Sequence, residues 1–205
     1  EYGGFNRGQV QISNSDTGIV NGLVGGIAKR NKTNNKGLAL HYAECHDNYT
    51  LFDKLAYSSN SSLENGFKGE NIVSYFPKSL NNEVFNSIEK QDKLAAAYIF
   101  LSQGTPFING GQEFLRTKKG NPDSYAADKK GGKIWSEEEL KECNRIDLSL
   151  REKNNDVYNT YRGLIGLRKA FPDSFCNDDN ASAETLDKAS VRASGGREIC
   201  KSIVV

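Results

Sequence analysis

The sequence contains no methionine, a single tryptophan, four prolines and two histidines among its 205 residues. No apolar run approaches the about 20 residues that a membrane-spanning helix needs, so the sequence predicts no membrane segment. The formal net charge is only +1, whereas a nucleic-acid-binding surface needs clustered positive charge, so we expect no nucleic-acid partner. The missing initial methionine predicts a processed chain or a fragment, and localisation is therefore left unknown.

Cysteine is scarce and scattered, at positions 45, 143, 176 and 200. No Cys-x-x-Cys pair or Cys/His ligand spacing is present, which argues against a zinc site and against a disulfide framework. No Asp- and Asn-rich ligand loop stands out either, so the sequence does not indicate a structural calcium ion but leaves one open. The sequence therefore predicts no metal ligands and no required cofactor, and it gives no indication of the oligomeric state.

One stretch organises the rest of the chain. A short apolar run at 38–45 predicts a buried strand, a polar triplet His46-Asp47-Asn48 follows, and residues 50–56 have a helical pattern. Strand, polar cluster and helix in this order are typical of β/α barrels, whose active sites lie where the strands end. Asp47 and His46 are thus candidate site residues. The alternative is that Asp47 caps the next helix and His46 is an ordinary loop histidine.

Three segments resemble one family in the same order. Residues 42–55, Tyr-Ala-Glu-Cys-His-Asp-Asn-Tyr-Thr-Leu-Phe-Asp-Lys-Leu, resemble the fourth signature region of α-amylase-type glycoside hydrolases, in its pullulanase and debranching-enzyme branch. Residues 102–116 resemble the eighth barrel strand and the loop after it. Residues 145–148 and 161–169 resemble the helix that closes the barrel.

This resemblance implies an α/β fold, the C-terminal portion of a (β/α)8 TIM barrel comprising strands seven and eight with their helices. Residues 1–174 would form the partial catalytic barrel, and residues 175–205 would be the truncated start of a C-terminal β-sandwich.

The resemblance also implies roles for the polar triplet. In the family, an aspartate after strand seven holds sugar hydroxyls and stabilises the oxocarbenium-like transition state, and Asp47 matches that residue. His46 matches the histidine that donates to the same sugar. The family's nucleophile and general acid follow strands four and five, and residues 1–205 contain no counterpart of either. We therefore expect the chain alone to be inactive.

Other polar residues allow more than one interpretation. Asn121 and Tyr125 lie in a segment that resembles a loop bordering the sugar site, but they also suit an ordinary turn. Glu113 is a second carboxylate near a strand end, and the resemblance implies that it serves the structure or the rim of the site. Asp147 lies in an Arg-x-Asp sequence that imitates the nucleophile motif, yet its place in the chain gives it no catalytic role.

The function implied is retaining hydrolysis of α-1,6-glucosidic linkages in pullulan, glycogen or limit dextrin, with a branched α-glucan as substrate. The alternatives are an isoamylase-type debranching enzyme, a non-catalytic α-glucan-binding protein, and a structural remnant with no ligand.

Helical periodicity predicts two long helices beyond the triplet. The first begins near Asn82 as its cap and ends before Gly104, and a short strand follows at 105–108. The second covers the region from Val157 to the residue before Pro172, with Arg162, Arg168 and Lys169 forming a solvated basic side. A capping box at Ser136–Glu139 predicts a short exposed helix between them.

Overall fold

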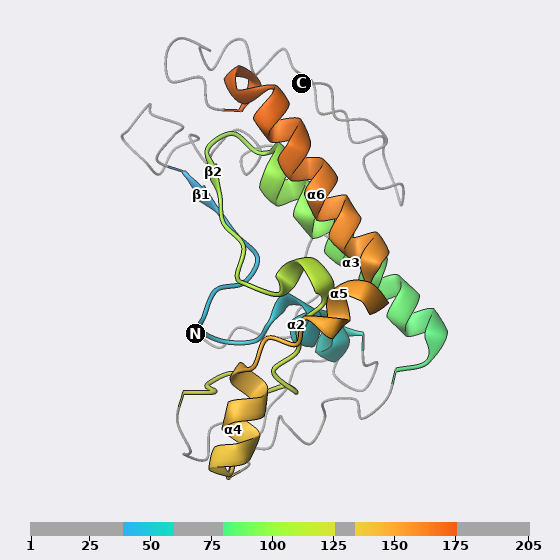
Figure 1. The fold of residues 1–205 in the computed structure, drawn as a ribbon, viewed down its shortest axis with the longest axis vertical. Helices are drawn as coiled ribbons and strands as arrows, with labels where there is room; N and C mark the ends of the chain where they lie inside the picture. The colour runs from blue at the N-terminus through green and yellow to red at the C-terminus, as the bar shows by residue number, and fades with distance from the viewer. Residues whose placement is uncertain (1–38, 60–79, 126–133, 176–205) are drawn as a thin grey trace. The chain divides into compact units, whose positions relative to one another are not determined.

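The structure is a computed structural model that describes residues 39–59, 80–125 and 134–175. It contains strands β1 (Leu40–His41) and β2 (Thr105–Pro106) and helices α2 (Leu51–Ser58), α3 (Asn82–Leu101), α4 (Glu137–Asn144), α5 (Ser149–Lys153) and α6 (Asn155–Ala170) (Figure 1). Two short 3-10 helices, η4 (Gln112–Phe114) and η6 (Pro172–Ser174), complete the set. The described helices include none that could cross a membrane.

The chain divides into two compact units. Unit 1 comprises residues 1–7, 43–95 and 108–162, and unit 2 comprises residues 8–42, 96–107 and 163–205. The proposed β domain at 175–205 lies outside the described residues except for Phe175. The predicted division into one domain at 1–174 and another at 175–205 therefore stays a prediction.

Strands β1 and β2 of unit 2 pair in parallel, with Leu40 opposite Thr105 and His41 opposite Pro106. The N–H of Thr105 donates to the Ala39 carbonyl at 2.7 Å, and that of Phe107 donates to the His41 carbonyl at 2.8 Å. Pro106 falls between these two donors, so its missing N–H removes no bond from the ladder. Parallel strands with helices between them in the sequence agree with the expected α/β class.

The first strand is shorter and more exposed than predicted. It spans two residues, and both Leu40 and Tyr42 are 55% exposed, so the prediction of a buried strand is wrong for these residues. The physical reason is that, within the described ranges, β1 and β2 form a two-stranded sheet that no further strand covers. The ring of Tyr42 instead packs edge-on against Phe107, with centroids 6.1 Å apart.

Helix α2 in unit 1 begins with Thr50 as its cap. The Thr50 hydroxyl accepts a hydrogen bond from the N–H of Asp53 at 3.1 Å, which satisfies one free donor of the first turn. Asp47 is therefore not the cap of this helix, which excludes the first half of the alternative, whereas His46 as an ordinary loop histidine stays an open interpretation. The helix buries Leu51, Leu55, Ala56 and Tyr57.

Two further helix starts follow local sequence signals. Asn81, one residue before the predicted Asn82, caps α3, because its Oδ1 accepts from the Val84 N–H at 2.8 Å. Both bonds of the capping box between Ser136 and Glu139 are present at the start of α4, as predicted. Helix α3 ends at Leu101, and Gly104 follows with a φ of 110° that favours glycine.

Arg168 of α6 corrects the prediction of a solvated basic side. Its guanidinium donates to the carbonyls of Phe100 and Ser102, each at 2.8 Å, and to that of Gly104. It also lies over the Phe175 ring, 4.8 Å from the centroid. All of these residues belong to unit 2, which contains the C-terminal ends of α3 (residues 96–101) and α6 (residues 163–170). One arginine thus satisfies carbonyls at and beyond the end of α3, where no helical partner is available.

Replacing Arg168 by methionine is expected to lower the free energy of unfolding by about 2 kcal/mol, because three carbonyls lose a charged donor. Urea denaturation of the chain measures this change. Lys169 is exposed on the same helix, and Lys169→Met should alter stability by less than about 0.5 kcal/mol. Equal losses in the two variants would show that the carbonyls do not depend on Arg168.

Candidate active-site edge

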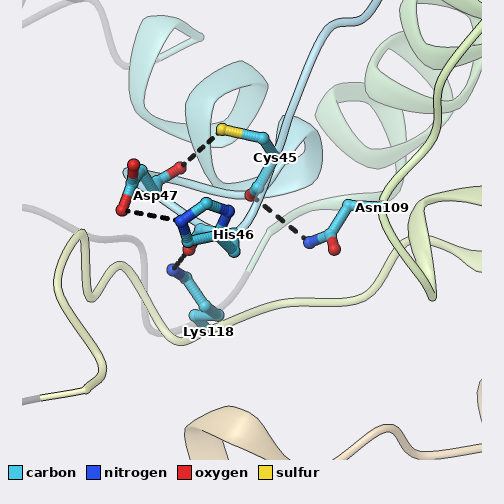
Figure 2. Close-up of polar contacts among 5 residues, drawn as sticks. All are labelled: Cys45, His46, Asp47, Asn109 and Lys118. Carbon is cyan, nitrogen blue, oxygen red and sulfur yellow. Dashed lines mark hydrogen bonds and ion pairs between the residues drawn. The ribbon is translucent and has the colours of Figure 1, made fainter.

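The candidate site residues His46 and Asp47 lie next to each other in unit 1, and both side chains are open to solvent. They are 88% and 60% exposed, and the His46 Nε2 lies 3.4 Å from the Asp47 Oδ1 (Figure 2). Asn48 follows in the left-handed region, with a φ of 63°, which turns the chain toward α2. A carboxylate and an imidazole presented in this way can accept from and donate to the hydroxyls of a bound ligand.

The backbone beneath these side chains is held by two residues from the segment after β2. Asn109 Nδ2 donates to the Cys45 carbonyl at 3.4 Å, and Lys118 Nζ donates to the His46 carbonyl at 3.3 Å (Figure 2). Sequence reasoning missed both residues. No local signal distinguishes a lysine that reaches a carbonyl 72 residues away from an ordinary surface lysine.

Glu44 is a buried acid directly before the site. The sequence places it in the predicted strand and gives it no role of its own, but its Oε2 accepts from the Leu51 N–H at the start of α2. Burial raises the pKa of Glu44 to about 7, although the Leu51 N–H and the Asn109 side chain oppose the rise. The carboxyl therefore helps to hold α2 against the segment that carries His46 and Asp47.

The two candidate residues in the loop after η4, Asn121 and Tyr125, differ in their exposure to solvent. Asn121 is 1% exposed, and its Oδ1 accepts from the Asp123 N–H at 2.8 Å, as in an ordinary turn. Tyr125 is 74% exposed, which leaves its ring accessible to a ligand. The turn interpretation describes the contact that Asn121 makes, and a role of either residue in sugar binding stays a prediction.

The other two acids have local structural partners. Glu113 Oε2 accepts from the Gly111 N–H at 3.0 Å, within the turn that forms η4. Asp147 Oδ1 accepts from the Ser149 N–H at 3.0 Å, at the start of α5. Both contacts are local and structural, while a role of Glu113 at the rim and the lack of a catalytic role for Asp147 stay predictions.

One cluster in the described part of the chain brings metal-ligand atoms together. The thiol of Cys45, the imidazole of His46 and the carboxylate of Asp47 lie within 4.8 Å of one another. The Lys118 ammonium contacts the same turn and opposes a bound cation. We therefore assign no metal to these residues.

Comparison with known proteins gives sequence and structural relatives, although no protein-family model matches the chain. The sequence is 32% identical over 134 residues to a pullulanase of Bacillus subtilis, a match that covers 65% of this chain and 14% of that protein. The chain thus spans only about one seventh of the length of this relative.

Two solved structures resemble the chain. The pullulanase from Bacillus acidopullulyticus matches 91% of this chain and 18% of its own, with a TM-score of 0.60 and 28% identity. A mutant pullulanase from Paenibacillus barengoltzii, complexed with maltotetraose, matches 81% of this chain and 22% of its own, with a TM-score of 0.55 and 29% identity. The resemblance found in the sequence is confirmed, and the chain is a relative of the type I pullulanase and debranching branch of the glycoside hydrolases.

Proposed function

We propose that the chain supplies one edge of the α-glucan site of a debranching hydrolase that cleaves α-1,6-glucosidic linkages. The observation that carries this proposal is the pairing of His46 and Asp47, exposed side by side while Thr50 takes over the capping of α2. A carboxylate that the fold does not use for capping, in a motif shared with pullulanases, is available for a ligand.

The chemistry follows from the charge that develops during hydrolysis. Retaining hydrolysis passes through an oxocarbenium-like transition state and needs a nucleophilic carboxylate and an acid on opposite sides of the bond. Asp47 stabilises the positive charge of that state as a third carboxylate, and His46 donates to a hydroxyl of the same sugar. The nucleophile and the acid come from outside residues 1–205.

The proposed fold places these residues at the carboxyl ends of barrel strands. β1 and β2 are neighbouring strands seven and eight of a (β/α)8 barrel, and their parallel pairing supports this assignment. Leu40 in β1, and Tyr42 and Phe107 directly after the two strands, are exposed apolar residues that other strands of a barrel would cover. The start of a C-terminal β-sandwich at 175–205 belongs to the same proposal.

The first experiment asks whether the chain binds an α-glucan and where. The sequence contains only two histidines, so the C2–H proton of His46 gives a resolved NMR signal that His41→Gln assigns. We expect maltotetraose to shift the His46 signal and to leave that of His41 in place. Saturation with maltotetraose that moves neither signal, or moves only that of His41, would contradict the proposed site.

The second experiment asks whether binding leads to cleavage. The complete protein that carries this chain is incubated with pullulan, which contains α-1,6 linkages, and with amylose, which contains only α-1,4 linkages. We expect new reducing ends from pullulan alone. Binding without product would favour a non-catalytic glucan-binding protein, and product from amylose alone would exclude debranching.

A further inference from the structure

Asp53 is a buried carboxylate that organises the loop at 117–120. It lies in the first turn of α2 and is fully buried. Its Oδ2 accepts from the N–H groups of Lys118 at 2.9 Å and Gly120 at 3.1 Å, while its Oδ1 accepts from the Thr117 hydroxyl. A buried carboxylate with three donors fixes the backbone of the loop that surrounds it.

The backbone of the loop at 117–120 is folded so that its donors can converge on Asp53. Lys119 and Gly120 adopt positive φ angles of 55° and 75°. The N–H groups of Lys118 and Gly120, on either side of Lys119, both point at the Asp53 carboxylate. The Thr117 hydroxyl accepts from the Lys119 N–H at 2.9 Å, and the Tyr57 hydroxyl donates to the Gly120 carbonyl at 3.3 Å. Helix α2 thus holds the loop through two side chains, Asp53 and Tyr57.

Lys118 is fixed on both sides of its own backbone and reaches the candidate site. The Cys143 thiol donates to its carbonyl at 3.3 Å, and Asp53 holds its N–H. Lys118 is only 3% exposed, a rare state for lysine, and the ammonium donates to the His46 carbonyl (Figure 2). Burial lowers the pKa of Lys118, while the negative charge of Asp53 opposes that fall.

We propose that Lys118, held in place by Asp53, is a positioning residue that sets the direction in which His46 and Asp47 project. The contact from Lys118 to the His46 carbonyl leaves both side chains exposed, so it constrains the turn without occupying the ligand groups. Its effect on glucan binding rests on the proposed function, whereas its effect on the turn does not. Positioning of this kind matters because small displacements of functional groups reduce catalysis strongly.

The test compares Lys118→Met with Lys118→Arg in the 205-residue chain. Lys118→Met nearly keeps the length of the side chain and removes the ammonium, so we expect the His46 NMR signal to move and that of His41 to stay. Maltotetraose affinity should fall about tenfold. Lys118→Arg restores a charged donor and should bring the His46 signal and the affinity back toward wild type. A purely space-filling role of Lys118 would not predict this rescue.

Lys119→Met is the matched control, because Lys119 is the exposed neighbour in the same loop, and it should leave the His46 signal unchanged. The buried Trp135 reports by fluorescence whether each variant folds. If Lys118→Met does not fold, Lys118→Gln replaces it and should move the His46 signal in the same way. An unchanged His46 signal in folded Lys118→Met or Lys118→Gln overturns the positioning role. A moved signal in a chain that never binds maltotetraose supports that role and overturns the proposed function instead.

Discussion

Asp47→Asn is expected to lower kcat for pullulan hydrolysis by on the order of 10²–10³ in the complete protein that carries this chain. Asparagine keeps the size of the side chain and its ability to accept a hydrogen bond, but it removes the negative charge. In the proposed function, that charge acts on the oxocarbenium-like transition state and much less on the neutral ground-state sugar. The loss should therefore appear in kcat and in kcat/KM together, with a smaller change in KM.

Asp147→Asn is the matched control for this prediction. Asp147 is an aspartate in unit 1 whose Oδ1 accepts from the Ser149 N–H at the start of α5. Its Arg-x-Asp sequence imitates the nucleophile motif, so the control also tests that imitation. We expect turnover close to wild type for Asp147→Asn. A kcat for Asp47→Asn within about threefold of wild type would exclude the transition-state role.

The second large effect is a fall in stability with rising pH, caused by buried acids. Asp92 on α3 is fully buried, and its Oδ1 accepts from the Tyr161 hydroxyl at 2.9 Å, which in turn accepts from Gln112 Nε2 at 2.9 Å. Burial raises the pKa of Asp92 to about 8, and the nearby charge of Glu44 adds to the rise. The Tyr161 hydrogen bond acts in the opposite direction, because it stabilises the carboxylate.

The direction of the pH effect follows from proton binding. Unfolded Asp92 releases its proton near its ordinary pKa of 3.8, whereas the folded chain keeps that proton up to about pH 8. Between these values the folded state binds more protons, so raising the pH favours the unfolded state. The titration of Asp92 alone is expected to lower the free energy of unfolding by on the order of 4 kcal/mol between pH 5 and pH 8. The titration of Glu44 lowers the free energy of unfolding further as the pH rises to about 7.

Urea denaturation at pH 5 and pH 8 tests this expectation. Asp92→Asn mimics the protonated acid and keeps an acceptor for the Tyr161 hydroxyl. The decrease in the free energy of unfolding from pH 5 to pH 8 should therefore be smaller in this variant by on the order of 4 kcal/mol. Tyr161→Phe removes the bond that stabilises the carboxylate, so stability should continue to fall above pH 8. If Asp92→Asn loses stability with pH as steeply as wild type, Asp92 does not titrate in this range.

The elements that follow from local sequence were predictable. The capping box at Ser136–Glu139 starts α4, and the helical pattern that begins at Thr50 becomes α2. These signals can be read because a cap and its donor lie about three residues apart, whatever surrounds them. The order of apolar run, polar triplet and helical pattern likewise identifies His46 and Asp47 as candidates from the sequence alone.

Burial was the least predictable property. The sequence predicts a buried Leu40 and a solvated Arg168, whereas Leu40 is exposed and Arg168 donates to three carbonyls. An apolar residue is buried only if another element covers it, and an arginine is solvated only if no carbonyl lies within its reach. Both conditions depend on residues far away in the sequence.

Motifs and contacts between near neighbours were enough to find the resemblance to debranching enzymes, to predict α2, α3, α4 and α6, and to select His46 and Asp47 as candidates. The residues that support that pair became visible only in the folded chain. Asp53 meets Gly120 across 67 residues and Lys118 meets His46 across 72, and both contacts exist only once α2 and the loop at 117–120 are packed together. A buried ion pair or hydrogen bond forms when distant segments bring donor and acceptor within about 3 Å, and that distance is a property of the fold.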